Sequence, residues 1–211
     1  MGHMVEEALR RRGLELACAS EDVCAVPAEL ASECVCIDFT TPDAFRANYK
    51  TIAKNFKAAV VGTTGWYDIK DEVFAEFEKN GTTLIWGSNF SIGVIAFFAG
   101  VARTCQVLKD HGYAPHVEEI HHIHKLDAPS GTAKSVGGLI EAFLGVKPEI
   151  GYQRIGEVPG THIAEFTSGV DKLTFTHEAF SREGFAQGAV AAAQMTEGLE
   201  GVHDFQELLF K

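Results

Sequence analysis

Short apolar runs alternate with helical patterns along the first half of the chain, and this alternation constrains the fold more than any other feature. The helical patterns cover residues 5–12, 42–55 and 68–79, and the runs expected to be strands are residues 14–19, 34–39, 58–61 and 83–86. Strands separated by helices of this length indicate a parallel sheet, which binds its ligand at the carboxyl ends of its strands. Phe39, residues 62–64 and residues 87–90 follow three of the expected strands. We therefore expect an α/β domain with a ligand site at these three ends.

The pattern changes after Ser91. We expect a long apolar helix over residues 92–108, a strand over 117–120 and a helix after Thr132. Residues 161–168 and 172–178 then alternate between apolar and polar side chains, which predicts an antiparallel hairpin. The sequence thus indicates a second, α+β domain over residues 92–182. Residues 1–91 and 183–211 make the first domain, with a helix expected over residues 188–201.

Composition narrows the possible partners and the compartment. The formal net charge of −11 argues against nucleic acid or an anionic membrane surface as a partner. The five cysteines form no CxxC pair, which favours reduced thiols in a cytosolic protein. The most apolar run, residues 92–102, is about half as long as the roughly 20 residues that a bilayer requires. The amino end also lacks an apolar signal core. We expect a cytoplasmic protein.

One segment concentrates the chemistry: residues 119–133 read EIHHIHKLDAPSGTA. Three histidines and a lysine precede Pro129, Ser130 and Thr132, residue types that are common where a helix begins. The first turn of a helix offers unpaired N–H groups and a positive dipole end to an anion. Histidine and lysine can bind that anion and can also transfer protons. This segment therefore predicts a site for chemistry on an acidic small molecule.

These histidines have two other interpretations, a metal site and a structural loop. A metal site would need a carboxylate or cysteine at a defined spacing. In an extended segment His121 and His122 point to opposite faces, so we expect no shared metal ion. A structural loop is the alternative for any single histidine. On an acidic protein, an anionic ligand needs a local island of positive charge. Such an island can act independently of the distant negative charges, because salt screens charges over roughly 8 Å. The candidates for that island are His121, His122, His124, Lys125, Arg154 and Arg182.

The same segment resembles the signature of dihydrodipicolinate reductase, the nicotinamide-dependent enzyme of bacterial lysine and diaminopimelate synthesis. Further blocks resemble that family in its order: DFTTP (38–42), VGTTG (61–65), SNFSIGV (88–94), RIGEVPGTH (154–162) and REGFAQGA (182–189). The resemblance covers nearly the whole chain. It implies a Rossmann-like dinucleotide-binding domain and an α+β domain that binds substrate and forms a homotetramer. The implied reaction is the reduction, by NADH or NADPH, of a cyclic dicarboxylate to tetrahydrodipicolinate, in the cleft between the domains.

The resemblance also implies residue roles. His121 and Lys125 are the proton-transfer pair, with Lys125 as the direct donor, because a lysine ammonium in water (pKa about 10.4) stays protonated at neutral pH. The residues implied in substrate binding are His122, Ser130, Gly131 and Thr132. Those implied in cofactor binding are Gly2, Phe39, Gly62, Thr63, Thr64, Gly87, Ser88, Asn89, Phe90 and Arg182. Arg154 and Arg182 are equally compatible with structural ion pairs and with cofactor contacts.

The amino end departs from the family pattern. The family opens with a strand and a Gly-x-x-Gly-x-x-Gly turn that holds the pyrophosphate, whereas here Gly2 matches one of the later glycines. We expect the first strand of the sheet to be missing and cofactor binding to be weakened. Gly2-His3-Met4 is also typical of a cloning scar. Two alternatives follow: a truncated relative that binds dicarboxylate and oligomerises but is catalytically impaired, and another two-domain dehydrogenase that acts on an amino-acid-like acid.

A second departure concerns the choice of cofactor. Thr41 stands where many family members have an arginine, a candidate contact for the 2′-phosphate of NADPH. An acid, Glu21 or Asp22, follows the expected strand over residues 14–19, which corresponds to the second strand of the family, and has no basic neighbour. An acid without an arginine favours NADH over NADPH.

Overall fold

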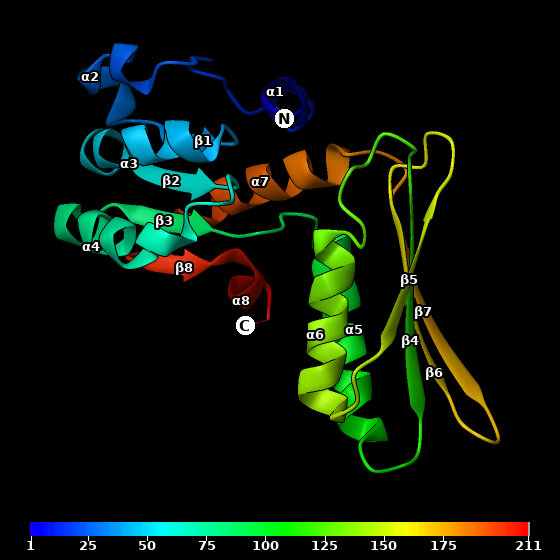
Figure 1. Ribbon diagram of the computed structural model, residues 1–211. Helices are drawn as coiled ribbons and strands as arrows, with labels where there is room; N and C mark the ends of the chain where they lie inside the picture. The colour runs from blue at the N-terminus through cyan, green and yellow to red at the C-terminus, as the bar shows by residue number, and fades with distance from the viewer. Residues whose placement is uncertain (211) are drawn as a thin grey trace. The chain divides into compact units, whose positions relative to one another are not determined.

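The computed structural model describes residues 1–210, which fold into two compact units. Residues 1–91, together with the chain from residue 183 onward, form the first unit, and residues 92–182 form the second (Figure 1). Each unit has a sheet of four strands and its own apolar core. Among the described residues, no helix is both long enough and apolar enough to cross a bilayer.

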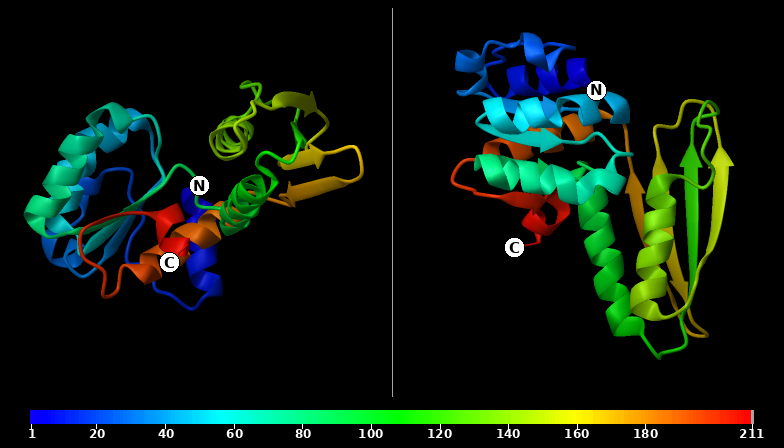
Figure 2. Two further views of the ribbon diagram at one scale, coloured as in Figure 1. Left: turned by 90° about the horizontal axis from the view of Figure 1, so that it is seen from below. Right: turned by 60° about the vertical axis from the view of Figure 1, so that its left-hand side comes forward.

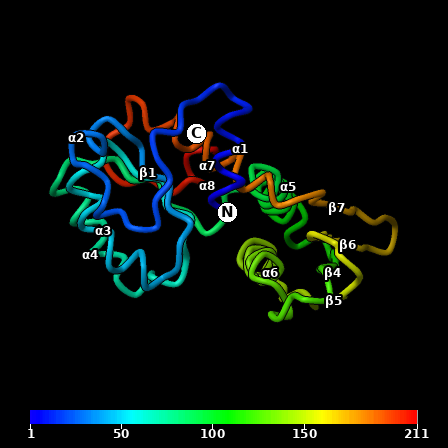
Figure 3. Tube along the Cα trace, turned by 90° about the horizontal axis from the view of Figure 1, so that it is seen from above, coloured from blue at the N-terminus to red at the C-terminus, as the bar shows by residue number. Residues whose placement is uncertain are grey.

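A parallel sheet forms the centre of the first unit. Its strands lie side by side in the order β1 (Val35–Asp38), β2 (Ala58–Val61), β3 (Thr83–Trp86) and β8 (Val202–Asp204). Helices α3 (Pro42–Asn55) and α4 (Lys70–Asn80) lie on one face (Figure 3). On the other face, α7 (Glu183–Met195) packs against the sheet and carries α1 (Gly2–Arg11). The remaining elements are α2 (Ala28–Ala31), α8 (Phe205–Leu209) and the 3-10 turns Val23–Ala25 and Tyr67–Ile69.

Local signals place several of these elements where the sequence predicts them. The Thr41 hydroxyl accepts a hydrogen bond from the Ala44 N–H (3.3 Å), and Pro42 stands in the first turn, so α3 begins at Pro42. Helix α4 ends at Gly81, whose φ of +67° suits glycine. The predicted helix over residues 42–55 and the predicted strands over 58–61 and 83–86 are confirmed.

The strand predicted over residues 14–19 is wrong. Residues 14–20 have no regular structure, and Leu16 is 41% exposed. Strand β1 pairs with β2 alone among the described residues, so no adjacent strand meets its other edge. A strand is stable only when its backbone groups bond to a neighbour, and an apolar run without one stays irregular.

The helix predicted over residues 188–201 is displaced. Helix α7 spans Glu183–Met195, and the chain then turns through Gly198 and Gly201, whose φ values are +77° and +87°. Residues 202–204 form β8, an edge strand too short to show an alternating pattern in the sequence. The sequence therefore gives the right element type with the wrong boundaries.

The second unit packs two helices on one face of a mixed sheet. Its strands lie in the order β5 (Glu149–Arg154), β4 (Ala114–His121), β6 (Thr161–Thr167) and β7 (Lys172–Glu178). Only the β4–β5 pair is parallel. Helices α5 (Ile92–Leu108) and α6 (Gly131–Leu144) cover one face of this sheet (Figure 2). The predicted helix over residues 92–108 and the predicted antiparallel hairpin are confirmed, whereas β5 was not predicted.

Candidate active site

Strand β4 points one row of side chains toward the helices. Val117, Glu119 and His121 are buried on that face, and Glu118 lies on the opposite face, where its carboxylate accepts a hydrogen bond from Gln153 (3.1 Å). This alternation is the period of two that a strand imposes. The His/Lys segment, residues 119–133, thus begins at the carboxyl end of β4, where Glu119 and His121 face inward.

The helix start predicted after this segment is confirmed. Ser130 is the N-cap of α6, and its hydroxyl accepts a hydrogen bond from the Ala133 N–H (3.2 Å). The backbone N–H of Ser130 donates to Oε1 of Glu119 (3.0 Å). Gly131 and Thr132 form the first turn of α6. The amino end of α6 is therefore anchored to the end of β4.

Glu119 is completely buried; its Oε1 is hydrogen-bonded, and its Oε2 has an ion-pair contact but no aligned hydrogen bond. Oε1 accepts hydrogen bonds from the Ser130 N–H and from Nη2 of Arg154 (2.9 Å), and Oε2 lies 2.8 Å from Nδ1 of His121. Burial alone would raise the pKa of Glu119, but the hydrogen bonds from Ser130 and Arg154 and the nearby His121 together lower it below its ordinary value. Glu119 is therefore a carboxylate at neutral pH.

Arg154 ties the loop to this carboxylate. Its guanidinium donates to Glu119, to the carbonyl of Asp127 (2.7 Å) and to the carbonyl of Lys125 (3.3 Å). All of these groups belong to the second unit. The sequence left two roles open for Arg154, a structural ion pair and a cofactor contact. The contacts in the structure are those of a structural ion pair.

The remaining predicted residues of the segment lie around this anchor. His121 is buried, and burial lowers its pKa, as do Lys125, Arg154 and His122, against the opposite effect of Glu119. His121 is therefore neutral at pH 7. Nζ of Lys125 lies 2.7 Å from Oδ1 of Asp127.

The other two histidines of the segment are more accessible. His122 is half-buried, and His124 is exposed, with Nε2 lying 3.1 Å from Oε1 of Glu157. Their rings lie 6.0 Å apart. Five of the six residues predicted to form the positive island thus lie in or beside this loop, but His121 is neutral at pH 7, and Lys125 and Arg154 are paired with Asp127 and Glu119. Arg182 is the last residue of the second unit and is exposed.

His162 is a further member that the sequence analysis missed. It lies on β6 directly opposite Glu119, with Nε2 3.5 Å from the Ser130 hydroxyl and its ring 5.2 Å from that of His121. Burial, together with the positive charge that His121 and His177 can carry, lowers the pKa of His162 to about 4. Only the register between β4 and β6 shows that His162 belongs here, because more than 40 residues separate it from Glu119 in the chain.

Glu119, His121 and His162 also form the kind of group that could hold a metal ion. Their ligand atoms all lie within 4.8 Å of one another. The sequence led us to expect no metal ion shared by His121 and His122, whereas the group in the structure consists of Glu119, His121 and His162. Arg154 already supplies a positive charge to Glu119, which makes a second cation less favourable there. The contacts therefore favour a hydrogen-bonded group over a metal centre.

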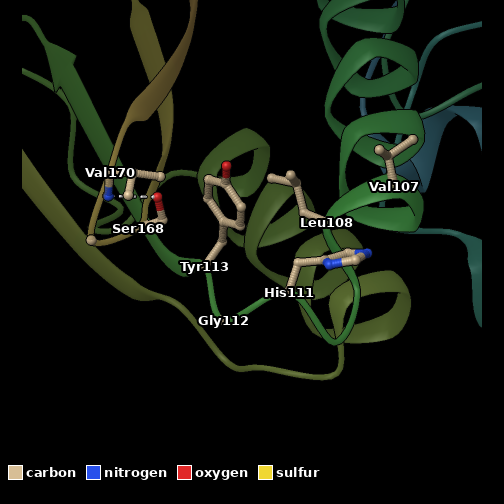
Figure 4. Close-up of a pocket in the computed structure, with 8 residues that line it drawn as sticks. Val107, Leu108, His111, Gly112, Tyr113, Ser168 and Val170 are labelled. Atoms are coloured by element: carbon tan, nitrogen blue, oxygen red, sulfur yellow. Dashed lines mark hydrogen bonds between the residues drawn. The ribbon is translucent and has the colours of Figure 1, made fainter.

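A hollow of about 530 Å³ lies at the other end of β4 (Figure 4). It is lined by Val107, Leu108, His111, Gly112, Tyr113, Ser168, Gly169 and Val170. The Tyr113 hydroxyl donates to Asp171 (2.7 Å), and none of the lining residues belongs to the predicted site. Since β4 runs from Ala114 to His121, its eight residues separate this hollow from the His/Lys loop. The hollow is therefore not the candidate site.

In the first unit, the predicted cofactor residues gather at the carboxyl edge of the sheet. Phe39, Gly62–Thr64 and Gly87–Phe90 follow β1, β2 and β3, which are adjacent and parallel. The Phe39 ring lies where a side chain on residue 62 would be, since a Cβ on Gly62 would come within 2.1 Å of it. Phe39 also packs edge-on against Phe90 (5.5 Å between centroids). This edge thus combines a close backbone turn with a half-buried aromatic ring.

The side chains at this edge are not equally available. The Thr63 hydroxyl is buried and donates to Asp38, so it is not available to a ligand, whereas Thr64 and Ser88 are exposed. Oδ1 of Asn89 accepts from the Ser91 N–H (2.8 Å). Gly2 lies in the first turn of α1.

The acid expected after the strand over residues 14–19, Glu21 or Asp22, does not stand at the end of a strand. Residues 14–19 form no strand, and Asp22 instead caps a short 3-10 turn, accepting from the Cys24 N–H (2.9 Å). The Thr41 hydroxyl caps α3. The absence of an arginine at position 41 is the part of the argument that remains.

Comparison with known proteins now identifies the family. Residues 1–90 match the family described as dihydrodipicolinate reductase, N-terminus, and residues 93–209 match dihydrodipicolinate reductase, C-terminus. The chain belongs to the dihydrodipicolinate reductase family. The 4-hydroxy-tetrahydrodipicolinate reductase of Christiangramia forsetii is 37% identical over 190 residues, covering 83% of this chain and 79% of that protein. The enzyme of that name from Methanopyrus kandleri is 35% identical over 195 residues, covering 83% and 71%.

A solved structure shows the same fold. Dipicolinate-bound dihydrodipicolinate reductase from Paenisporosarcina sp. TG-14 matches with a TM-score of 0.70 at 20% identity, covering 82% of this chain and 73% of that one. The predicted fold class, a Rossmann-like α/β domain with an α+β domain, is thereby confirmed.

Proposed function

We propose that the chain uses NADH or NADPH to reduce 4-hydroxy-tetrahydrodipicolinate, a cyclic dicarboxylate, to tetrahydrodipicolinate in diaminopimelate and lysine synthesis. The observation that carries the proposal is the group around Glu119, which holds His121, the Lys125 loop and the amino end of α6 together. The names of its relatives support the same reaction. No match favours a catalytically impaired relative.

The amino end of α6 would bind a substrate carboxylate. Backbone N–H groups of Gly131 and Thr132, the Thr132 hydroxyl and the helix dipole favour an anion there, and His122 lies beside them. The Asp127 carboxylate supports this assignment, because Lys125 and the Gly131 N–H both lower its pKa. Lys125 and the Gly131 N–H, which would both face the substrate, thus already stabilise one carboxylate, that of Asp127.

Lys125 and His121 would move the proton. The substrate takes up one hydride and one proton and loses its 4-hydroxyl group as water. The ammonium of Lys125 would donate the proton, and the resulting amine would regain one from solvent by way of His121, which is neutral at pH 7. The nearby carboxylate of Asp127 directs the ammonium group of the lysine.

The first unit would hold the nicotinamide cofactor, which supplies the hydride when bound. The carboxyl edge of its sheet is suited to a flat ring, because the half-buried Phe39, which packs directly on Gly62, offers an aromatic ring there. The residues proposed to contact the cofactor are Gly2, Phe39, Gly62, Thr63, Thr64, Gly87, Ser88, Asn89, Phe90 and Arg182. For Thr63 the contact would be through the backbone.

We expect NADH to be the better cofactor. A 2′-phosphate calls for a cation, and at position 41 the chain has a threonine whose hydroxyl caps α3. The absence of one charge-assisted hydrogen bond of about 1.5 kcal/mol lowers kcat/KM about ten-fold for NADPH. Steady-state kinetics with both cofactors measures this ratio. A large preference for NADPH would refute it.

We propose further that the protein is a cytoplasmic homotetramer. All five cysteines are free. In the described residues, helices cover one face of the second unit's sheet, and the other face carries Ile120 and Ile163 among polar side chains. A sheet face of this kind is suited to pairing between copies. Light scattering is expected to give four times the 22.9 kDa of one chain, and a monomer mass at micromolar concentration would contradict the tetramer.

A further inference from the structure

We infer that Glu119 is the positioning residue of the proposed reductase site: one of its oxygens orients His121, and the other holds the Lys125 loop and the start of α6. The inference rests on the proposed function and gives a role to Glu119, which opens the motif but is not among the proton-transfer or substrate-binding residues. The carboxylate on β4 is bonded directly by Arg154 of β5 and by Ser130 at the amino end of α6, and the same Arg154 also bonds the backbone of the Lys125 loop.

The burial of Glu119 shows how strongly this arrangement is determined. A buried carboxylate is tolerated only when hydrogen bonds and opposite charge replace its hydration. Glu119 is fully buried, and its partners are a backbone N–H, a guanidinium and an imidazole nitrogen. If any of the three moves away, the carboxylate loses part of this compensation, so the group holds together as one arrangement.

Oε2 determines which nitrogen of His121 carries the proton. It lies 2.8 Å from Nδ1, and although the two atoms are not aligned as a hydrogen bond, two lone pairs at this distance would repel, so the contact favours the proton on Nδ1. Nε2 then has a free lone pair. Gly160 leaves room for that edge of the ring, because a Cβ at position 160 would come within 2.9 Å of Nε2. The orientation of the ring is therefore limited on both sides.

Oε1 acts on the other half of the site through Arg154. The guanidinium that bonds this oxygen also bonds the backbone carbonyls of Lys125 and Asp127. The same oxygen accepts from the N–H of Ser130, the residue before the proposed carboxylate site. Lys125, His121 and the helix start are thus placed relative to one another by a residue that does not itself contact substrate.

Glu119→Gln is the informative substitution. Glutamine keeps the shape, and its oxygen can still accept from Ser130 and Arg154, but its NH₂ group then faces Nδ1 and favours the other tautomer of His121. We expect kcat to fall about 10–100-fold, the usual effect of losing a partner that orients a functional histidine. Affinity for pyridine-2,6-dicarboxylate and the melting temperature are expected to change little.

The pH profile gives a readout that a purely structural role would not move. The charged or titratable groups facing His121 are Glu119 on β4, His122 and Lys125 in the loop, Arg154 on β5 and His162 on β6. Glu119 is the one that raises the pKa of His121, so its neutralisation shifts the limb of the kcat/KM profile that belongs to His121 to lower pH. Glu141→Gln, the same change at an exposed position of α6, should leave both rate and profile unchanged.

A direct measurement keeps the inference testable if Glu119→Gln does not fold. Nitrogen-15 NMR of the unaltered protein is expected to show His121 protonated on Nδ1 at neutral pH. Protonation on Nε2, or a folded Glu119→Gln variant with unchanged kcat and pH profile, would overturn the inference. If instead the unaltered protein does not turn over 4-hydroxy-tetrahydrodipicolinate, the proposed function fails, while the NMR result still reports on Glu119 alone.

Discussion

Replacing Lys125 with alanine is expected to lower kcat by about 10²–10⁴-fold, the range for loss of a general acid. Lys125 is the proposed proton donor, and its ammonium lies 2.7 Å from Asp127 beside the start of α6. The affinity for pyridine-2,6-dicarboxylate should fall much less than kcat, because the N–H groups of α6 remain. Steady-state kinetics and calorimetric titration of the same preparation separate the two effects.

Lys147→Ala is the matched control for this variant. It removes the same charge from the same unit, at an exposed position just after the carboxyl end of α6. Its turnover should equal that of the unaltered protein. Turnover by Lys125→Ala at the normal rate would exclude Lys125 as the proton donor.

Replacing Gly131 with proline is expected to raise the KM for substrate about ten- to hundred-fold, since a hydrogen bond to a charged group contributes about 1.5–3 kcal/mol. The substitution removes one backbone N–H from the proposed carboxylate site. Proline is well tolerated at the first position of a helix, and Ser130 before it already has extended backbone, with φ −63° and ψ +161°. Helix α6 should therefore remain intact.

Gly131→Ala is the control. Alanine keeps the N–H group, and a Cβ on residue 131 has no atom within 4 Å, so the site keeps its shape. We expect a KM close to normal for Gly131→Ala. Equal effects of proline and alanine would show that the N–H group of residue 131 does not bind the substrate.

The elements that the sequence predicted well are those whose ends are determined by residues adjacent in the chain. Helix α3 depends on a cap at Thr41 and on Pro42, both next to its first turn, and its bounds match the prediction. The run over residues 14–19 has the composition of a strand, but pairing depends on a neighbour that the run itself does not encode. Strand β5 was missed because its pattern is mostly polar and it is held by pairing with β4.

The candidate site likewise combines residues that the sequence indicated locally with residues that only the fold brings together. His121, His122, Lys125 and the Ser130 cap stand close together in the chain, so their composition alone indicated an anion site. Glu119 was visible in the same segment, but its role depends on Arg154 and His162, which reach it from β5 and β6. That role follows from strand register, which sequence patterns of single segments do not specify.

The central claim is that residues 121–132 bind a dicarboxylate, and calorimetric titration with pyridine-2,6-dicarboxylate tests it most directly. The unaltered protein and Gly131→Ala are expected to bind one diacid per chain with similar dissociation constants. Gly131→Pro should bind about ten-fold or more weakly. Absence of binding to the unaltered protein, or equal binding by all three proteins, would contradict the account.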